Sequence, residues 1–271
     1  RKSRDESSSG NPNGDDRVMK NFVLFLSMLA LSACSTFYKA PSASVDEATK
    51  KSALDAYARV LEKFVNDKGQ IDFHGLRDNR ADLNRYVAFV STADLESFKG
   101  KERMAHYLNS YNALSMNLVI EKGIPKTNAG LKKVGFFFLA KMDIGGKEMS
   151  LHSYENELIR KAGDERVHFA LNCMAVSCPR LPKTPFTATK LDEELDREAK
   201  FFFSEPRNLT VNKEKKEIQL TEILKFFTED FVPAKAPTLH DYVSKWTSQE
   251  IPRDYKIEFV DYDWSINDSK R

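Results

Sequence analysis

The sequence predicts an α+β fold in which helix clusters pack on a small antiparallel sheet. Amphipathic helical periods alternate with hairpin signals rather than with single strands, which argues against a regular βαβ repeat. The 271 residues include 19 Phe and 9 Tyr, which is enough bulk to fill one hydrophobic core. Neither an internal repeat nor a sustained heptad pattern is present, so a solenoid or a coiled coil is not expected.

The start of the chain carries targeting signals rather than fold elements. Residues 1–18 are polar and are interpreted as a disordered or wrongly assigned upstream segment. Residues 19–33 have a basic start, an apolar run and small residues at the end, which predicts a signal peptide. The apolar run is shorter than the roughly 20 residues that a permanent membrane helix needs. Residues 34–45 are expected to form a tether, and residues 46–267 a single domain.

The end of the signal segment, Leu31-Ser32-Ala33-Cys34, resembles a bacterial lipobox. The resemblance implies that Cys34 is acylated and anchors the protein in a membrane through several acyl chains, which bind more stably than one. Ser35 follows the cysteine in place of aspartate, which implies a periplasm-facing lipoprotein of the outer membrane in the bacterial cell envelope. An ordinary secretory signal, in which Cys34 has no role, is the alternative.

Helices and hairpins can be expected in order along the domain. Apolar residues at helical spacing predict helices over 46–66, 78–90 and 101–122, the last of which ends before Gly123. A Gly145-Gly146 pair predicts the turn of a hairpin. The remaining expected elements are that hairpin over 134–149, a helix capped by Ser150 and ending near Arg160, a helix over 190–204, a hairpin over 211–220, helices over 221–229 and 238–248, and a strand over 256–260.

Residues 166–179 combine one histidine with two of the three cysteines of the chain. In the first half of this stretch apolar residues alternate with polar or small ones, which predicts a buried strand. A strand would put His168 and Asn172 on one face, because alternate side chains point to opposite sides. A loop with Cys173 and Cys178 follows, so this stretch is the best candidate for a reactive site.

The residue types in this stretch predict a Cys–His–Glu site for acyl transfer. The thiolate is the nucleophile, and a nearby histidine both lowers the pKa of a thiol and returns the proton to the leaving group. His168 would act as base and acid, and Glu155, on the preceding helix, would orient it as the third member of a triad. Either Cys173 or Cys178 could be the nucleophile.

Cys173 is favoured because the residue after it has a backbone N–H that can stabilise an oxyanion. Cys178 precedes Pro179, which has no such N–H. In a competing hypothesis, Cys173 and Cys178 form a disulfide in an oxidising compartment, which would remove the nucleophile. With His168 they would supply only three ligands to zinc at a spacing that matches no familiar motif, so neither a metal nor another cofactor is expected.

Asn109 and Asn112 are three residues apart and therefore share one face of the predicted helix over 101–122. Asparagine is unfavourable inside a helix, because its side chain competes for backbone hydrogen bonds. These two residues, together with Asn172, are interpreted as polar supports that bind substrate or form an oxyanion hole. The alternative is a structural network that connects the helix to a neighbouring loop.

Several ordered motifs resemble the family catalogued as domain of unknown function 547. They are Asn109-Ser-Tyr-Asn-Ala113, the Gly145-Gly146 turn with the helix that carries Glu155, and His168-Phe-Ala-Leu-Asn-Cys173 followed by Ser177-Cys-Pro179. The resemblance covers about residues 70–267. The family has no settled activity, so papain- or transglutaminase-like thiol chemistry is implied only by analogy.

Composition narrows the class of partner. The chain has 42 Lys and Arg against 40 Asp and Glu, a formal charge of +2, so no nucleic-acid partner is expected. The first functional hypothesis is a lipid-anchored envelope protein with a thiol site for amide or thioester acyl transfer or hydrolysis. The second is a non-catalytic module that binds peptide or glycan and contains a Cys173–Cys178 disulfide. The sequence leaves open whether the protein is an enzyme.

Overall fold

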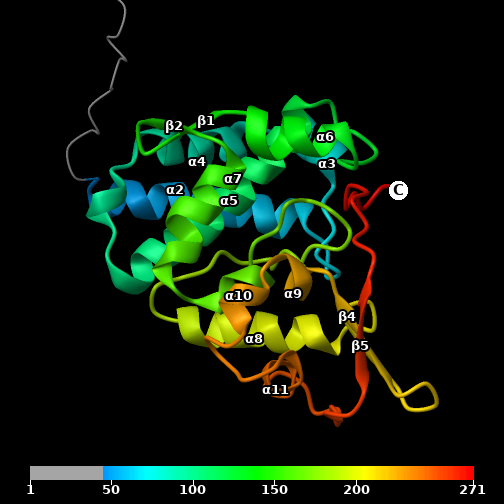
Figure 1. Ribbon diagram of the computed structural model, residues 1–271. Coiled ribbons are helices and arrows are strands. Elements are labelled where there is room, and N and C mark those ends of the chain that lie inside the picture. Colours follow the sequence, from blue (N-terminus) through cyan, green and yellow to red (C-terminus); the bar gives the residue numbers. More distant parts are fainter. Residues whose placement is uncertain (1–44) are drawn as a thin grey trace, which may run out of the picture. The chain divides into compact units, whose positions relative to one another are not determined.

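The computed structural model describes residues 45–271 (Figure 1). The predicted upstream segment 1–18, the signal peptide 19–33 and the lipidation site Cys34 lie outside the described residues, as does the tether 34–45 except for its last residue. In the part of the chain that is described, no helix has the length and apolar character required to cross a membrane.

The three helices predicted in the first half of the domain are present. They are α2 (Glu47–Phe64), α4 (Ala81–Thr92) and α5 (Gly100–Glu121), and a short helix, α3 (Phe73–Asp78), connects the first two. Asp46 begins α2, because its side chain accepts a hydrogen bond from the N–H of Thr49. Every residue of α5 from 104 to 120 is buried, so α5 is the central helix and the others cover it.

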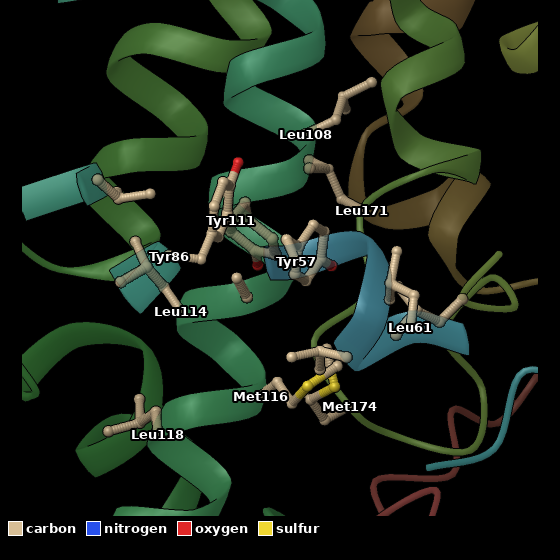
Figure 2. Close-up of a cluster of buried hydrophobic side chains, with 14 of the residues drawn as sticks. Tyr57, Leu61, Tyr86, Leu108, Tyr111, Leu114, Met116, Leu118, Leu171 and Met174 are labelled. Carbon is tan, nitrogen blue, oxygen red and sulfur yellow. The ribbon is translucent and has the colours of Figure 1, made fainter. Parts of the chain in front are cut away.

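The first hydrophobic core lies among α2, α4, α5 and the segment that carries the cysteines. Tyr57 of α2 and Tyr86 of α4 stack with their ring centroids 4.7 Å apart. Figure 2 shows Leu171 and Met174 among the side chains of α2 and α5. The residues on both sides of Cys173 are therefore packed in this core, which positions the cysteine loop against α5.

The predicted hairpin and the helix after it are confirmed in part. β1 (Met142–Ile144) and β2 (Lys147–Met149) pair antiparallel around the two glycines. Gly145 has a φ of +60°, and a Cβ at this position would lie 2.6 Å from the Leu95 side chain, so glycine is required. Ser150 caps α7 (Leu151–Ser153), as predicted, by accepting the N–H of Ser153.

The segment before β1 was expected to be extended, and that prediction is wrong. The chain instead forms α6 (Leu131–Val134) and a π-helical turn, Gly135–Leu139. Phe136 and Phe137 are buried whereas the next two residues are exposed, a pattern of two in and two out that suits a helical turn. A second π-helical turn, Tyr154–Ile159, continues α7.

The second half of the fold contains one helix on a three-stranded sheet with shorter helices between its strands. Its elements are α8 (Leu191–Ser204), β3 (Leu209–Asn212), β4 (Glu217–Thr221), α9 (Ile223–Phe226), α10 (Thr228–Phe231), α11 (Leu239–Val243) and β5 (Lys256–Val260). β4 pairs antiparallel with β3 but parallel with β5, so this sheet is mixed rather than antiparallel. The helices between β4 and β5 supply the crossover that parallel pairing needs. The α+β class is confirmed.

The buried strand predicted from residue 166 onward is wrong. Residues Glu165–Phe169 form a 3₁₀ turn, and the chain then continues without regular structure. Val167 packs in the first core, whereas Phe169 packs in a second core formed by α8 and the mixed sheet. Because the segment runs between two cores, every residue from 167 to 172 is buried. The alternation of residue types that suggested a strand arises because the side chains of this segment pack into two different cores.

The last residues of the chain join the two halves. Isolated bridges pair Ile71 with Asp268, Thr127 with Ser265, and Ala175 with Ile266. The third of these bridges lies in the cysteine loop, and Ile266 is only 3% exposed. The C-terminal segment therefore holds the cysteine loop against the helices.

Candidate functional site

A cavity of about 330 Å³ contains all four side chains that the sequence predicted as catalytic. Cys173, Cys178, His168 and Glu155 lie in its wall. Much of the remaining wall is apolar and includes Phe137, Phe138, Leu171, Phe226, Phe227 and Trp264. The cavity thus combines an apolar wall with a few titratable groups, which is the usual composition of a small-molecule site.

The two cysteines form a contact pair in the cavity wall. Both are free, and their Sγ atoms lie 2.6 Å apart. Cys178 is buried and accepts hydrogen bonds from the Cys173 N–H at 3.0 Å and from the Tyr262 hydroxyl at 3.1 Å. Cys173 is partly exposed to the cavity. Three donors therefore converge on Cys178, counting the Cys173 thiol.

These contacts divide the protons between the two sulfur atoms. Burial alone raises the pKa of the Cys178 thiol, but hydrogen bonds from the Cys173 thiol, from Tyr262 and from backbone N–H groups lower it below the usual range. The hydrogen bond to Cys178, together with burial, raises the pKa of Cys173. Cys178 is therefore the more acidic thiol of the pair and Cys173 the less acidic one.

The argument that favoured Cys173 through its neighbouring N–H is wrong. The N–H of Met174 donates to the Asn172 side chain at 2.7 Å, so it has no free hydrogen for an oxyanion. Met174 has a φ of +67°, an unusual backbone for a residue with a side chain. Its buried side chain and this hydrogen bond together hold that conformation.

His168 is held by a carboxylate that the sequence did not indicate. Its Nε2 lies 2.7 Å from Oδ2 of Asp230, and Arg160 binds both oxygens of the same carboxylate at 2.7 and 2.9 Å. Burial raises the pKa of Asp230, but the hydrogen bonds from His168 and Arg160 outweigh it and hold that pKa well below the usual range. Asp230 is therefore an anion that fixes the imidazole as a triad carboxylate does.

The second ring nitrogen of His168, Nδ1, has no hydrogen-bond partner among the described residues. Among the described residues the hydrogen bonds of this side chain involve Nε2 alone, and the imidazole lies in the cavity wall. Its ring stacks on Phe227 at 4.1 Å, which limits rotation. With the Nε2 proton donated to Asp230, the Nδ1 lone pair is the group that can accept a proton in the cavity.

Glu155 does not take the predicted role as partner of His168. Its carboxylate accepts a hydrogen bond from the Tyr111 hydroxyl at 3.1 Å. Arg160, on the same helical segment, forms its ion pairs with Glu229 and Asp230 of α10 instead. Burial raises the pKa of Glu155, so this carboxyl keeps its proton to a higher pH than an exposed one.

The three predicted supporting asparagines bind backbone on both ends of their amide groups. Asn109 donates to the Phe186 carbonyl and accepts the Phe186 N–H, at 2.8 and 2.9 Å. Asn112 likewise donates to Ala170 and accepts from Asn172. The Asn172 side chain donates to the Pro179 carbonyl across the loop. These contacts form the structural network that was the alternative to a substrate-binding role. None of the three amides lies in the cavity wall.

The site therefore has two parts that share one cavity without direct contact. Among residues 45–271 no hydrogen bond joins His168 to either cysteine sulfur, whose side-chain partners are each other and Tyr262. No group of three or more His, Cys, Asp and Glu side chains in that range is arranged to hold a metal ion.

Sequence reasoning missed the residues that complete each part. Asp230 lies 62 positions after His168 in a four-residue helix, where no local pattern marks it. Tyr262 lies 84 positions after Cys178. Tyr111 lies 44 positions before Glu155, to which its hydroxyl donates. A regular spacing signals a helix face, but a hydrogen bond between distant segments leaves no local signal.

Comparison with known proteins assigns part of the chain to a family. Residues 95–203 match the family model described as "Protein of unknown function, DUF547". This range includes both cysteines, His168 and Glu155, and it ends before Asp230 and Tyr262. No curated protein and no solved structure matches the chain.

Proposed function

Because the chain carries a DUF547 domain, whose family has no described activity, we propose a function from the site itself: thiol-dependent transfer or hydrolysis of an acyl group from an amide or thioester. One observation carries this proposal. Two cysteine thiols in contact, of which Cys178 has the lowered pKa, a histidine held by a carboxylate and a carboxyl with a raised pKa all lie in the wall of one cavity. Groups whose environments separate their pKa values are suited to acid and base roles.

In the first half of the proposed reaction, Cys173 attacks because it is the more exposed sulfur. A bond forms between its Sγ and the carbonyl carbon, and its proton passes to the Cys178 thiolate, 2.6 Å away. The bond from that carbon to the leaving group then breaks. The leaving amine or thiolate takes a proton from the Glu155 carboxyl, which burial keeps protonated to a higher pH.

In the second half, water releases the acyl group. The water oxygen bonds to the acyl carbon and its proton goes to Nδ1 of His168, while Asp230 stabilises the imidazolium. Cys173 leaves and recovers its proton from Cys178. The imidazolium proton returns to the Glu155 carboxylate, which restores the starting state. Overall, one molecule of water is consumed, the bond from the acyl carbon to the leaving group is broken, and a carboxylic acid and the protonated leaving group are released.

The cellular setting belongs to the same proposal. The resemblance of residues 31–34 to a lipobox supports a protein anchored through Cys34 to the membrane of a bacterial cell envelope, facing the periplasm from the outer membrane. The substrate would then be an amide, ester or thioester present in the envelope, such as a peptide or a glycan that carries acyl groups.

The test is hydrolysis of p-nitrophenyl hexanoate by the full chain, with mass spectrometry of the acylated protein. We expect a hexanoyl adduct on Cys173 and loss of turnover by at least about a thousandfold in Cys173→Ala, because the nucleophile is absent.

Asp230→Asn should slow release of the acyl group by about a hundredfold or more, because the imidazole loses its anionic partner. Glu229→Gln is the matched control, since Glu229 also binds Arg160 but is exposed, and its turnover should not change. Turnover that persists in both Cys173→Ala and Cys178→Ala would refute the proposal.

The sulfur contact also favours a second candidate, a non-catalytic peptide- or glycan-binding module. Sulfur atoms 2.6 Å apart can form a disulfide with little movement of the loop, and an oxidising compartment would favour that bond. Titration of free thiols in the unfolded, unreduced chain distinguishes the two candidates. Free thiols at Cys173 and Cys178 are expected of the enzyme, and a stable disulfide of the binding module.

A further inference from the structure

Four neighbouring apolar side chains on α6 and the following π-helical turn point away from the protein. Leu131 is 91% exposed and Leu139 70%, and Val134 and Phe138 are both more than 40% exposed. We call these four residues the apolar ridge. Single exposed apolar residues are common, but a contiguous group usually marks a contact surface. In Figure 1, α6 lies at the edge of the helical part, remote from α8 and α11.

The ridge is held in place by its own buried face. Phe136 and Phe137 point inward and pack on each other with ring centroids 5.0 Å apart. Phe137 also packs on Trp264 of the C-terminal segment, at 5.9 Å. Because these two side chains anchor the turn in the core, the opposite face of the same turn must project outward. The exposure of the ridge is therefore a defined feature of the fold.

Cationic side chains flank the ridge. Lys132 and Lys141 are exposed, and Lys133 lies over the Trp264 ring at 4.0 Å. Among the described residues no carboxylate lies within ion-pair distance of any of these three lysines, although many other lysines of the protein have such a partner. The positive charge beside the ridge is thus available to an anionic partner.

We propose that the apolar ridge docks on an anionic lipid surface. Apolar side chains next to lysines are typical of helices that lie in a membrane interface, where the lysines extend to the headgroups. A protein partner fits less well, because lysine is depleted at protein interfaces and leucine is under-represented among their hot spots. The positive charge beside the ridge and the residue types of the ridge therefore both favour an anionic lipid surface as the partner.

Docking would direct the cavity toward the membrane. Phe138 of the ridge and the neighbouring Lys133 are also part of the cavity wall. Phe226, another wall residue that is 40% exposed, has its ring centroid 5.5 Å from Nζ of Lys133. The ring of Phe138 also packs on the ring of His152, a further wall residue, with the two centroids 4.3 Å apart. A docked ridge therefore places the apolar mouth of the cavity at the lipid surface. Docking itself requires no reaction, so it stands or fails independently of the acyl-transfer proposal.

Tryptophan fluorescence of the full chain tests the ridge locally, which separates it from any contribution of residues 1–44. Leu131→Trp is mixed with vesicles of phosphatidylcholine and phosphatidylglycerol that contain brominated lipid. We expect its added emission to shift to the blue and to be quenched. Val260→Trp is the matched control, because Val260 is exposed but lies on β5, and its added emission should do neither.

Co-sedimentation with the same vesicles measures the strength of docking. Leu131→Glu combined with Leu139→Glu should weaken binding by at least about tenfold, because two apolar side chains no longer enter the lipid. Val260→Glu should bind as the unchanged protein does. Unshifted and unquenched Leu131→Trp emission would overturn the proposal. So would a dimer in lipid-free buffer that Leu131→Glu dissociates, since the ridge would then bind a second copy of this chain.

Discussion

At His168 one hydrogen bond decides which nitrogen can react. The carboxylate of Asp230 accepts a hydrogen bond from Nε2, and Arg160 helps to keep that carboxylate ionised. The opposite shift occurs at Glu155, where burial raises the pKa and outweighs the lowering effects of His168, the Tyr111 hydroxyl and Arg160. Two carboxyl groups near one cavity thus have pKa values shifted in opposite directions, and their surroundings alone make the difference.

Glu155→Gln should make the protein more stable and less active. The pKa of Glu155 is raised in the folded chain, so unfolding is favoured as pH rises through the ordinary carboxyl range of about 4.3 and beyond. Glutamine removes that penalty and keeps an acceptor for Tyr111. We expect a higher urea midpoint at neutral pH, no gain below the ordinary carboxyl pKa, and an esterase rate lower by about a hundredfold or more.

Glu157 provides the control for this substitution. It lies on the same π-helical turn but is exposed. Glu157→Gln should change neither the urea midpoint nor the rate. A Glu155→Gln protein whose midpoint falls at neutral pH would show that the carboxylate stabilises the fold, contrary to the pKa argument.

At the level of elements, α5 positions the site through its asparagines. Asn109 and Asn112 lie on one face of α5, within its buried stretch, and bind two different loops. An asparagine can satisfy one backbone carbonyl and one N–H at once, which an irregular segment inside a core requires. The poor helix propensity of these residues is outweighed by the buried groups they satisfy.

Replacing either asparagine by alanine should destabilise the protein by about 2–4 kcal/mol, because a buried carbonyl and a buried N–H lose their partners. Only Asn112→Ala should affect the thiols, since Asn112 binds the segment that leads into Cys173. Alkylation of Cys173 by iodoacetamide should become faster in Asn112→Ala and stay unchanged in Asn109→Ala, whose loop carries Phe186. Equal alkylation rates in both variants would contradict this role.

At the level of the whole molecule, the C-terminal segment connects the halves of the fold. It bridges to the start of the domain, to the loop after α5 and to the cysteine loop, and it supplies Tyr262 to Cys178. The site is therefore complete only when the last residues of the chain are in place. Folding of the site must await contacts between distant segments.

Ile266→Ala tests this connection. Ile266 is buried beside the cysteine loop, so its truncation should lower the free energy of unfolding by about 2–4 kcal/mol in a urea titration. Val260→Ala, on an exposed position of β5, should change it by no more than about 0.5 kcal/mol. Equal effects of the two substitutions would mean that the C-terminal segment does not hold the fold together.

Local features could be predicted wherever one short segment determined them. The spans of α2, α5 and α8, the cap at Ser150 and the turn at Gly145 depend on residues within a few positions of one another. The secondary-structure predictions were wrong where contacts with distant segments determine the local conformation. The 3₁₀ turn before Ala170 and the π-helical turn after α6 both resembled strands, because apolar residues there face partners that no local pattern describes.

The sequence by itself determined the α+β class, most helices and the candidate stretch around His168 and the cysteines, because propensity, capping and turn chemistry act over short distances. Only the tertiary structure decided that Asp230 holds the imidazole and that Cys178 is the more acidic of the two thiols. Each depends on hydrogen bonds and burial contributed by segments more than 60 positions away. A pKa reflects these three-dimensional surroundings, which sequence spacing does not describe.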